Sequence, residues 1–143
     1  MYRIVSKEML TPTICRMKVE ASRLASAALP GQFLIVRADE QGERIPLTIS
    51  DFDKDAGTVT IVTQKIGAST SEICSYEEGD SFSDVVGPLG IPSDFTEMSD
   101  EELAGKRYVF IAGGVGTAPV YPQVKWLHER GASVDVIIGA KTK

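Results

Sequence analysis

The residues Gly113-Gly114-Val115-Gly116-Thr117-Ala118-Pro119 decide how the C-terminal part of this 143-residue chain folds. They follow the apolar run Arg107-Tyr-Val-Phe-Ile-Ala112, which predicts a buried parallel strand. They precede residues 119–130, which predict a helix opened by Pro119 at its first position. A strand that runs through glycines into a helix N-terminus sets backbone N–H groups and the helix dipole against negative charge. The segment therefore predicts a pyrophosphate-binding turn.

The glycine pattern is G-G-x-G-x-A-P, which differs from the G-x-G-x-x-G fingerprint of the Rossmann fold. It also lacks the G-K-[ST] end of a P-loop, which disfavours nucleotide hydrolysis. The alternative interpretation is a tight strand–helix connection that binds no ligand. Residues 133–138 predict a second strand, with Gly131 at the C′ position of the helix.

A β-α-β unit of this size cannot cover both faces of a parallel sheet. A complete doubly wound domain also needs more residues than 107–143 provide. We therefore expect residues 107–143 to be about the first third of such a domain in a truncated chain, or another surface to cover the exposed sheet.

Residues 1–92 predict a small antiparallel barrel or sandwich, because short strand-like runs alternate with turn-forming sequences such as Leu29-Pro30-Gly31. Residues 93–106 include an acidic and polar run, residues 96–103, and they predict a linker to the segment 107–143 that can include one turn of helix. The six expected strands are Tyr2–Met9, Thr13–Glu20, Gln32–Ala38, Ile45–Ser50, Thr58–Lys65 and Asp80–Val86.

The composition and charge of the chain disfavour several classes of partner. The net charge of -5 and the pI of about 4.9 disfavour nucleic acid and anionic membrane surfaces as partners. The chain shows neither a membrane-length apolar stretch nor the apolar region of a signal peptide, so we expect it in the cytoplasm. Cys15 and Cys74 are the only cysteines, and neither has metal-ligand spacing to the other or to His128. We expect no metal site.

Three segments together resemble the ferredoxin–NADP⁺ reductase family: Arg44-Ile-Pro-Leu-Thr-Ile-Ser50, Val62-Thr-Gln-Lys-Ile-Gly-Ala-Ser-Thr70 and Ala112-Gly-Gly-Val-Gly-Thr-Ala-Pro-Val-Tyr-Pro122. Within that family the chain is most similar to flavin-bearing electron-transfer subunits. These include the small subunit of NADH-dependent ferredoxin:NADP⁺ oxidoreductase (sulfide dehydrogenase) and the dihydroorotate dehydrogenase electron-transfer subunit.

The resemblance implies a six-stranded antiparallel Greek-key β-barrel that holds FAD, followed by the first β-α-β of an NAD(P)-binding domain. It implies a subunit that passes hydride between NAD(P)H and FAD and single electrons to an iron–sulfur partner. The implied partners are a larger catalytic subunit and a ferredoxin-type acceptor. A [2Fe-2S] cluster is expected only in full-length relatives, and we expect this fragment alone to be weakly active or inactive. The alternative is a non-redox barrel that serves as an interaction or nucleotide-sensing module.

The resemblance places the flavin ring along Pro46-Leu47-Thr48. Leu47 would cover a ring face, and the Thr48 hydroxyl would reach the edge where hydride arrives, which makes it the catalytic candidate. The alternative is an ordinary edge strand that carries a proline. The family has an arginine three residues before that hydroxyl, where this chain has Ile45. Because adjacent strand residues face opposite sides, Arg44 either reaches the pyrophosphate through a bulge or is a solvated barrel arginine.

The remaining candidates form two phosphate sites and one strand end. Gly67, Ser69 and Thr70 predict a second anion site, or a simple helix N-cap. The resemblance implies that Val62, Thr63 and Gln64 contact the flavin through backbone groups. It assigns NAD(P)H to Gly113, Gly114, Gly116, Thr117, Ala118 and Pro119. We interpret Asp51, Asp53 and Asp55 as solvated turn carboxylates.

Overall fold

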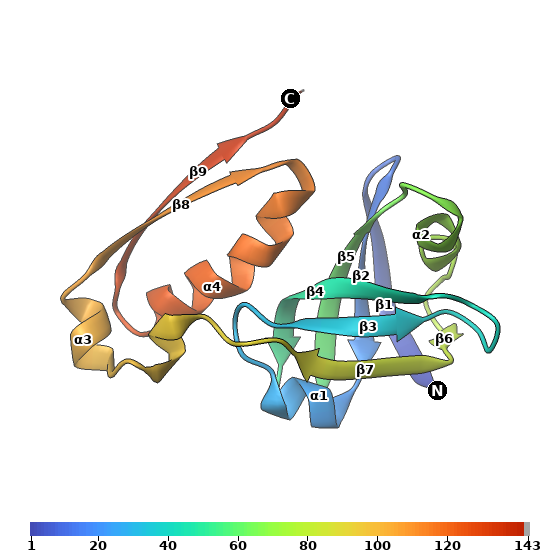
Figure 1. The fold of residues 1–143 in the computed structure, drawn as a ribbon, viewed down its shortest axis with the longest axis horizontal. Helices are drawn as coiled ribbons and strands as arrows, with labels where there is room; N and C mark the ends of the chain where they lie inside the picture. The colour runs from blue at the N-terminus through green and yellow to red at the C-terminus, as the bar shows by residue number, and fades with distance from the viewer. Residues whose placement is uncertain (142–143) are drawn as a thin grey trace.

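The computed structural model describes residues 1–141 and shows a nearly closed antiparallel barrel followed by a small parallel sheet with a helix (Figure 1). The barrel strands run in the order β6-β1-β2-β5-β4-β3-β7. Strands β3, β4 and β5 form consecutive hairpins and β2 returns beside β5, which is a Greek-key arrangement. The strands are β1 (Tyr2–Thr11), β2 (Ile14–Glu20), β3 (Phe33–Arg37), β4 (Arg44–Asp53), β5 (Thr58–Gln64), β6 (Ser81–Phe82) and β7 (Asp84–Leu89).

The prediction of six barrel strands is wrong, because the expected strand Asp80–Val86 is divided into β6 and β7. These two strands lie on opposite edges of the sheet, with only Ser83 between them. The Ser83 backbone N–H donates to the carbonyl oxygens of Arg37 at 3.1 Å and Ala38 at 2.9 Å. This corner brings the two edges together and nearly closes the barrel.

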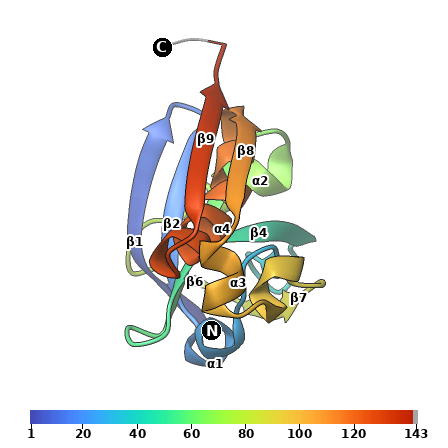
Figure 2. The same ribbon diagram turned by 90° about the vertical axis from the view of Figure 1, so that its left-hand side faces the viewer.

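The inward face of the strands forms the barrel core, as the alternation in β2 predicts. Cys15, Met17 and Val19 are buried, whereas the residues between them are exposed. Helices α1 (Ser22–Ala27) and α2 (Ala68–Ile73) lie at opposite ends of the barrel (Figures 1 and 2). They add apolar side chains to the same core, among them Leu24, Ala25 and Ile73.

The second part of the molecule has its own core. Strands β8 (Arg107–Gly113) and β9 (Ser133–Gly139) pair in parallel, and α4 (Thr117–Glu129) connects them through the short turn η2 (Gly114–Gly116). Residues 93–106, expected as a linker, fold into η1 (Asp94–Glu97) and α3 (Asp100–Ala104). They contribute side chains to this core, whose members are Leu103, Leu127, Ala132, Phe95, Met98, Tyr108, Phe110 and Val134. The expected domain boundaries at 92 and 106 stay a prediction, and residues 142–143 lie outside the described part.

The outer face of the parallel pair is exposed and apolar. Val109, Ile111 and Ile137 are each more than half exposed, because α3 and α4 pack only against the other face. Figure 2 shows β8 and β9 in front of α4. This agrees with the expectation that one β-α-β unit leaves a sheet face uncovered. Within residues 1–141, no helix combines the length and the apolar character that a membrane crossing needs.

The two cysteines meet in the barrel core. Cys15 on β2 and Cys74 after α2 are both buried, and their Sγ atoms lie 2.9 Å apart. Burial raises the pKa of the Cys15 thiol to about 12, and the hydrogen bond to Cys74 adds to this rise. The Cys15 thiol is therefore protonated and unreactive at neutral pH.

We predict that neither thiol reacts rapidly with a disulfide reagent at pH 8 while the protein is folded, because both side chains are buried and the raised pKa of Cys15 keeps it out of the reactive thiolate form. Both thiols should react promptly once a denaturant unfolds the chain. Absorbance of the released aromatic thiol, followed over time, measures this. One equivalent that reacts at the rate of a free thiol in native buffer would contradict the packing described for Cys15 and Cys74.

Candidate functional site

A cavity of about 620 Å³ lies between the barrel and the glycine-rich turn. This volume lies in the range of small-molecule sites. The barrel side is formed by residues of β2, β4 and β5 and by the β1–β2 hairpin, and the opposite side by η2 and the start of α4. The walls are mainly apolar, with Val62, Val115 and Tyr121 among them, and Arg16 and Lys18 add positive charge to the barrel side.

The glycine turn presents open backbone. Gly114 has a φ of +56°, a left-handed conformation that favours glycine. A Cβ atom placed on Gly114 or Gly116 would meet no other atom within 4 Å. The helix α4 begins at Thr117 and not at Pro119, so the expected position of Pro119 is corrected from first to third in the helix. Its missing N–H still falls within the first turn, where such groups have no partner inside the helix.

Strand β4 sorts its predicted residues onto two faces. Ile45 and Leu47 pack against the barrel core, so Arg44, Pro46 and Thr48 share the outward face. No bulge precedes Thr48, because the pairing with β3 is regular from Arg44 through Thr48. Arg44 therefore lies on the same face of the strand as the Thr48 hydroxyl, and no bulge is needed to bring it there. Leu47 offers only its backbone to a ligand on that face.

Arg44 and the start of α2 are brought together. The Arg44 guanidinium pairs with the Asp84 carboxylate on β7 at 2.8 Å. The Ser69 hydroxyl at the start of α2 donates to the carboxylate of Glu43, the residue before Arg44. The Thr70 hydroxyl accepts hydrogen bonds from the N–H groups of Ile66 and Gly67, as a helix cap does. Two of the separate sequence candidates thus form one polar end of the outward face.

Strand β5 continues the cavity wall. Val62 lines the cavity, whereas Thr63 points inward, where its hydroxyl is buried and has no hydrogen-bond partner among residues 1–141. Gln64 follows on the outward side at the end of the strand. The four predicted residues that line the cavity itself are Val62, Gly114, Thr117 and Ala118.

The remaining predicted residues lie beside the cavity. Thr48 is two residues before Ser50, which lines the cavity on the same strand. The row Arg44, Pro46, Thr48 therefore leads along β4 to the cavity and the glycine turn.

Sequence reasoning missed the charged wall formed by Arg16 and Lys18, and it missed Tyr121. The alternation in β2 predicts that both cations face outward. The sequence does not indicate which strands of the barrel face the glycine turn. Within residues 1–141, no group of three or more His, Cys, Asp or Glu side chains is placed to hold a metal ion.

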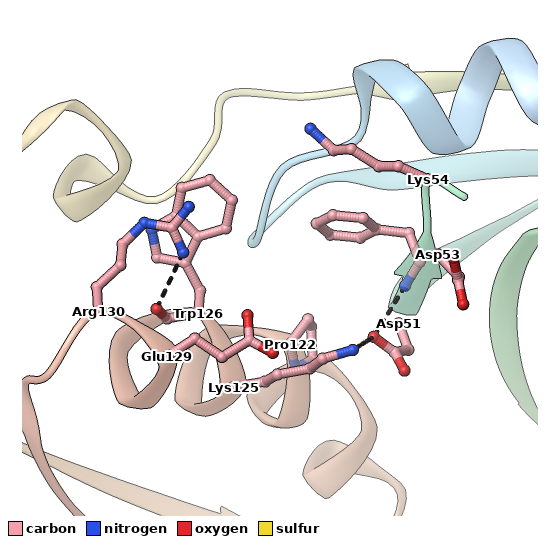
Figure 3. Close-up of a pocket in the computed structure, with 9 residues that line it drawn as sticks. Asp51, Asp53, Lys54, Pro122, Lys125, Trp126, Glu129 and Arg130 are labelled. Atoms are coloured by element: carbon pink, nitrogen blue, oxygen red, sulfur yellow. Dashed lines mark hydrogen bonds and ion pairs between the residues drawn. The ribbon is translucent and has the colours of Figure 1, made fainter. Parts of the chain in front are cut away.

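Asp51 corrects the interpretation of the turn carboxylates. Its side chain is only 29% exposed, and Oδ1 accepts a hydrogen bond from the Lys125 ammonium on α4 at 2.9 Å (Figure 3). This hydrogen bond raises the pKa of Lys125 above its ordinary value. A raised lysine pKa means that the pair contributes stability at neutral pH and loses it only at alkaline pH, as Lys125 deprotonates. Asp53 fits the expectation of an exposed turn carboxylate, bonded to the N–H groups of Asp55 and Ala56.

Comparison with known proteins gives relatives over the whole chain, although no protein-family model matches it. An uncharacterised protein from the adh 3′ region of Clostridium beijerinckii is 57% identical over 143 residues, which are 100% of this chain and 48% of that protein. A dihydroorotate dehydrogenase B (NAD(+)) electron transfer subunit homolog of Thermotoga maritima is 37% identical over 140 residues, 98% of this chain and 47% of that protein.

A solved structure agrees with these relatives. The NADH-dependent reduced ferredoxin-NADP oxidoreductase, solved for insight into flavin-based electron bifurcation, is 35% identical with a TM-score of 0.89. The match covers 100% of this chain and 49% of that chain. This chain spans about half the length of the curated relatives it matches. The resemblance to electron-transfer subunits of the ferredoxin–NADP⁺ reductase family, expected from three sequence segments, is confirmed.

We predict that Gly114→Ala lowers the free energy of unfolding by about 1 kcal/mol, because an alanine at a left-handed φ is strained. Gly116→Ala is the matched control, because its φ of −62° suits any residue and its Cβ has open space. We expect it to change stability by less than about 0.5 kcal/mol. Urea unfolding of both variants measures the difference, and equal stabilities would contradict the turn geometry.

Proposed function

We propose that the cavity and the outward face of β4 bind FAD and a nicotinamide dinucleotide, and that the chain is part of an electron-transfer flavoprotein subunit. In this role it passes reducing equivalents between NAD(P)H and an iron–sulfur partner. The observation that carries the proposal is the single cavity that joins Val62 of the barrel to Gly114 and Thr117 of the glycine turn. The proposal is supported by relatives that are named as electron transfer subunits.

The residues at the site fit a dinucleotide. The backbone at Gly114 and Gly116 has room for a diphosphate, and the first turn of the 13-residue helix α4 directs its N–H groups there. Val62, Val115 and Tyr121 provide the apolar surface that an aromatic ring needs. Arg16 and Lys18 stand on the opposite wall and match a ligand that carries negative charge.

FAD, when bound, supplies the hydride and single-electron chemistry, so the chain needs only to bind, orient and exclude water. The Thr48 hydroxyl is the side chain we assign to the reacting edge of the ring. Arg44, Ser69 and the backbone at Gly67 are the diphosphate contacts at the polar end of β4. The further FAD contacts are Pro46, Val62, Gln64 and Thr70, together with the backbone groups of Leu47 and Thr63. The NAD(P)H contacts are Gly113, Gly114, Gly116, Thr117, Ala118 and Pro119.

The proposed partners follow from the same role. A subunit that accepts reducing equivalents from a soluble dinucleotide needs a second protein to receive them. We propose a larger catalytic subunit and a ferredoxin-type acceptor, in the cytoplasm. A [2Fe-2S] cluster is proposed for full-length relatives and not for this fragment.

We predict that the purified chain binds FAD and takes on the absorbance near 450 nm, roughly where oxidised flavins absorb. Arg44→Gln should weaken FAD binding about tenfold, because one charge-assisted hydrogen bond is worth about 1.5 kcal/mol or more. Arg107→Gln is the matched control: Arg107 also pairs with one carboxylate, that of Asp135, but at the far end of β8. Equilibrium titration followed by flavin absorbance measures all three proteins.

Anaerobic addition of NADH or NADPH to the FAD-loaded chain should bleach that band if the glycine turn binds the dinucleotide. A protein that is folded by circular dichroism but binds no FAD would overturn the proposal and favour a non-redox interaction or nucleotide-sensing module. Equal FAD affinities for Arg44→Gln and the parent protein would remove Arg44 from the site.

A further inference from the structure

One ion pair connects the two parts of the molecule. Among residues 1–141, the contact between Lys125 of α4 and Asp51 of β4 is the one ion pair that joins the barrel to the β8–α4–β9 unit. Both side chains are partly buried, with 37% and 29% of their surfaces exposed. Partial burial makes such a pair more consequential than a fully exposed one.

A β-bulge is the reason that Asp51 reaches α4. Ile49 pairs with Ile61, and the next partnered residue is Asp51, opposite Thr60, so Ser50 is an extra residue in the strand. Without the extra residue, Asp51 would follow the alternation of Ile49 and face the core. The Ser50 hydroxyl donates to the Thr60 carbonyl oxygen at 3.1 Å, which holds the bulge in place.

The Asp51 carboxylate is also held from its own strand. Its Oδ1 accepts the backbone N–H of Phe52 at 2.9 Å as well as the Lys125 ammonium. The carboxylate is thus fixed before α4 contacts it, and less side-chain freedom is lost when the ion pair forms.

Asp51 separates two cavities. It lines the 620 Å³ cavity of the candidate site, and it lines a second cavity of about 380 Å³ on the other side. The second cavity lies between the β4–β5 turn and α4, and Figure 3 shows Lys125 reaching across to Asp51 beside Pro122 and Trp126. A change in this pair therefore alters the wall that faces the cofactor.

Lys125 lies on the same helix that begins at the candidate cavity. Thr117, the first residue of α4, lines the candidate cavity and precedes Lys125 by eight positions. At a rise of about 1.5 Å per residue, this separation is about 12 Å. α4 is one continuous helix from Thr117 to Lys125, although Pro122 within it removes one backbone hydrogen bond, so a shift of Lys125 moves the glycine turn relative to Val62.

We propose that the Asp51–Lys125 pair is a positioning contact that sets the spacing between the glycine turn and the barrel wall. The inference rests on the proposed function, since the spacing matters for a cofactor bound between the two parts. Neither residue is assigned to the reacting atoms.

The fluorescence of Trp126 can report on the contact between α4 and the barrel. Trp126 is the only tryptophan in the chain and follows Lys125 directly. The Arg130 guanidinium lies over its ring, 3.4 Å from the centroid. The indole N–H is buried without a hydrogen-bond partner among the described residues, and the ring lines the second cavity. Separation of α4 from the barrel would admit water to this ring and shift its fluorescence emission to longer wavelength.

The test compares Asp51→Asn and Lys125→Gln with matched controls. Glu129→Gln and Lys54→Gln remove the same charges from the same cavity, and neither residue makes an ion pair among those of residues 1–141. Lys125→Arg keeps the cation and serves as the conservative variant. Trp126 emission without FAD, and FAD affinity by titration, are measured for each protein after circular dichroism shows that it is folded.

We expect Asp51→Asn and Lys125→Gln to shift Trp126 emission to longer wavelength and to weaken FAD binding about tenfold, which is about 1.4 kcal/mol. The double variant should be no worse than either single one, because the two residues act as a unit. Lys125→Arg and both controls should behave as the parent protein.

Three results would overturn the inference. Unchanged emission in Asp51→Asn and Lys125→Gln would show that the pair does not hold α4 on the barrel. Changed emission with unchanged FAD affinity would show that the spacing does not matter to the cofactor. Equal losses in the control variants would show a general charge effect. A parent protein that binds no FAD would instead mark the failure of the proposed function, and the inference would fall with it.

Discussion

The alternation of inward and outward side chains along β4 is the constraint on which both the barrel core and the candidate site depend. Its inward side chains, Ile45, Leu47 and Ile49, anchor the strand in the barrel core. The same pleat fixes Arg44, Pro46 and Thr48 outward, because successive strand residues face opposite sides. A shift of one position in register would bury Arg44 and Thr48 and expose the core residues. The site and the stability of the barrel thus have one common origin.

The bulge at Ser50 ends that alternation where the second part of the molecule meets the barrel. Beyond it, β4 turns a carboxylate outward toward α4, and the parallel pair β8–β9 sets the glycine turn above the barrel wall. The candidate cavity therefore lies between the barrel and the β8–α4–β9 unit, and each part forms only one of its walls. This arrangement suits a ligand with two chemically different ends, since each core supplies one wall.

Much of this organisation could be predicted from residues with strong local preferences. The glycine turn, five barrel strands and the β8–α4–β9 order depend on local periodicity and backbone chemistry. The division of the sixth expected strand at Ser83 could not be predicted, because the local sequence pattern does not reveal a change of pairing partner. The role of Asp51 was missed because it depends on a bulge and on Lys125, which lies 74 positions along the chain. The alternation in β2 predicted that Arg16 and Lys18 face outward. That they face the glycine turn depends on the tertiary packing of the two parts, which the local sequence does not show.

The half-covered parallel pair has a consequence for anyone who handles the protein in solution. Within the described residues, β8 and β9 pair only with each other, so each leaves one row of peptide groups without strand partners. Those free edges flank an apolar face that carries Ile111 and Ile137. Open strand edges beside apolar surface are templates for edge-to-edge association. The apparent mass of the isolated chain should accordingly rise with protein concentration and fall when a mild detergent covers this face.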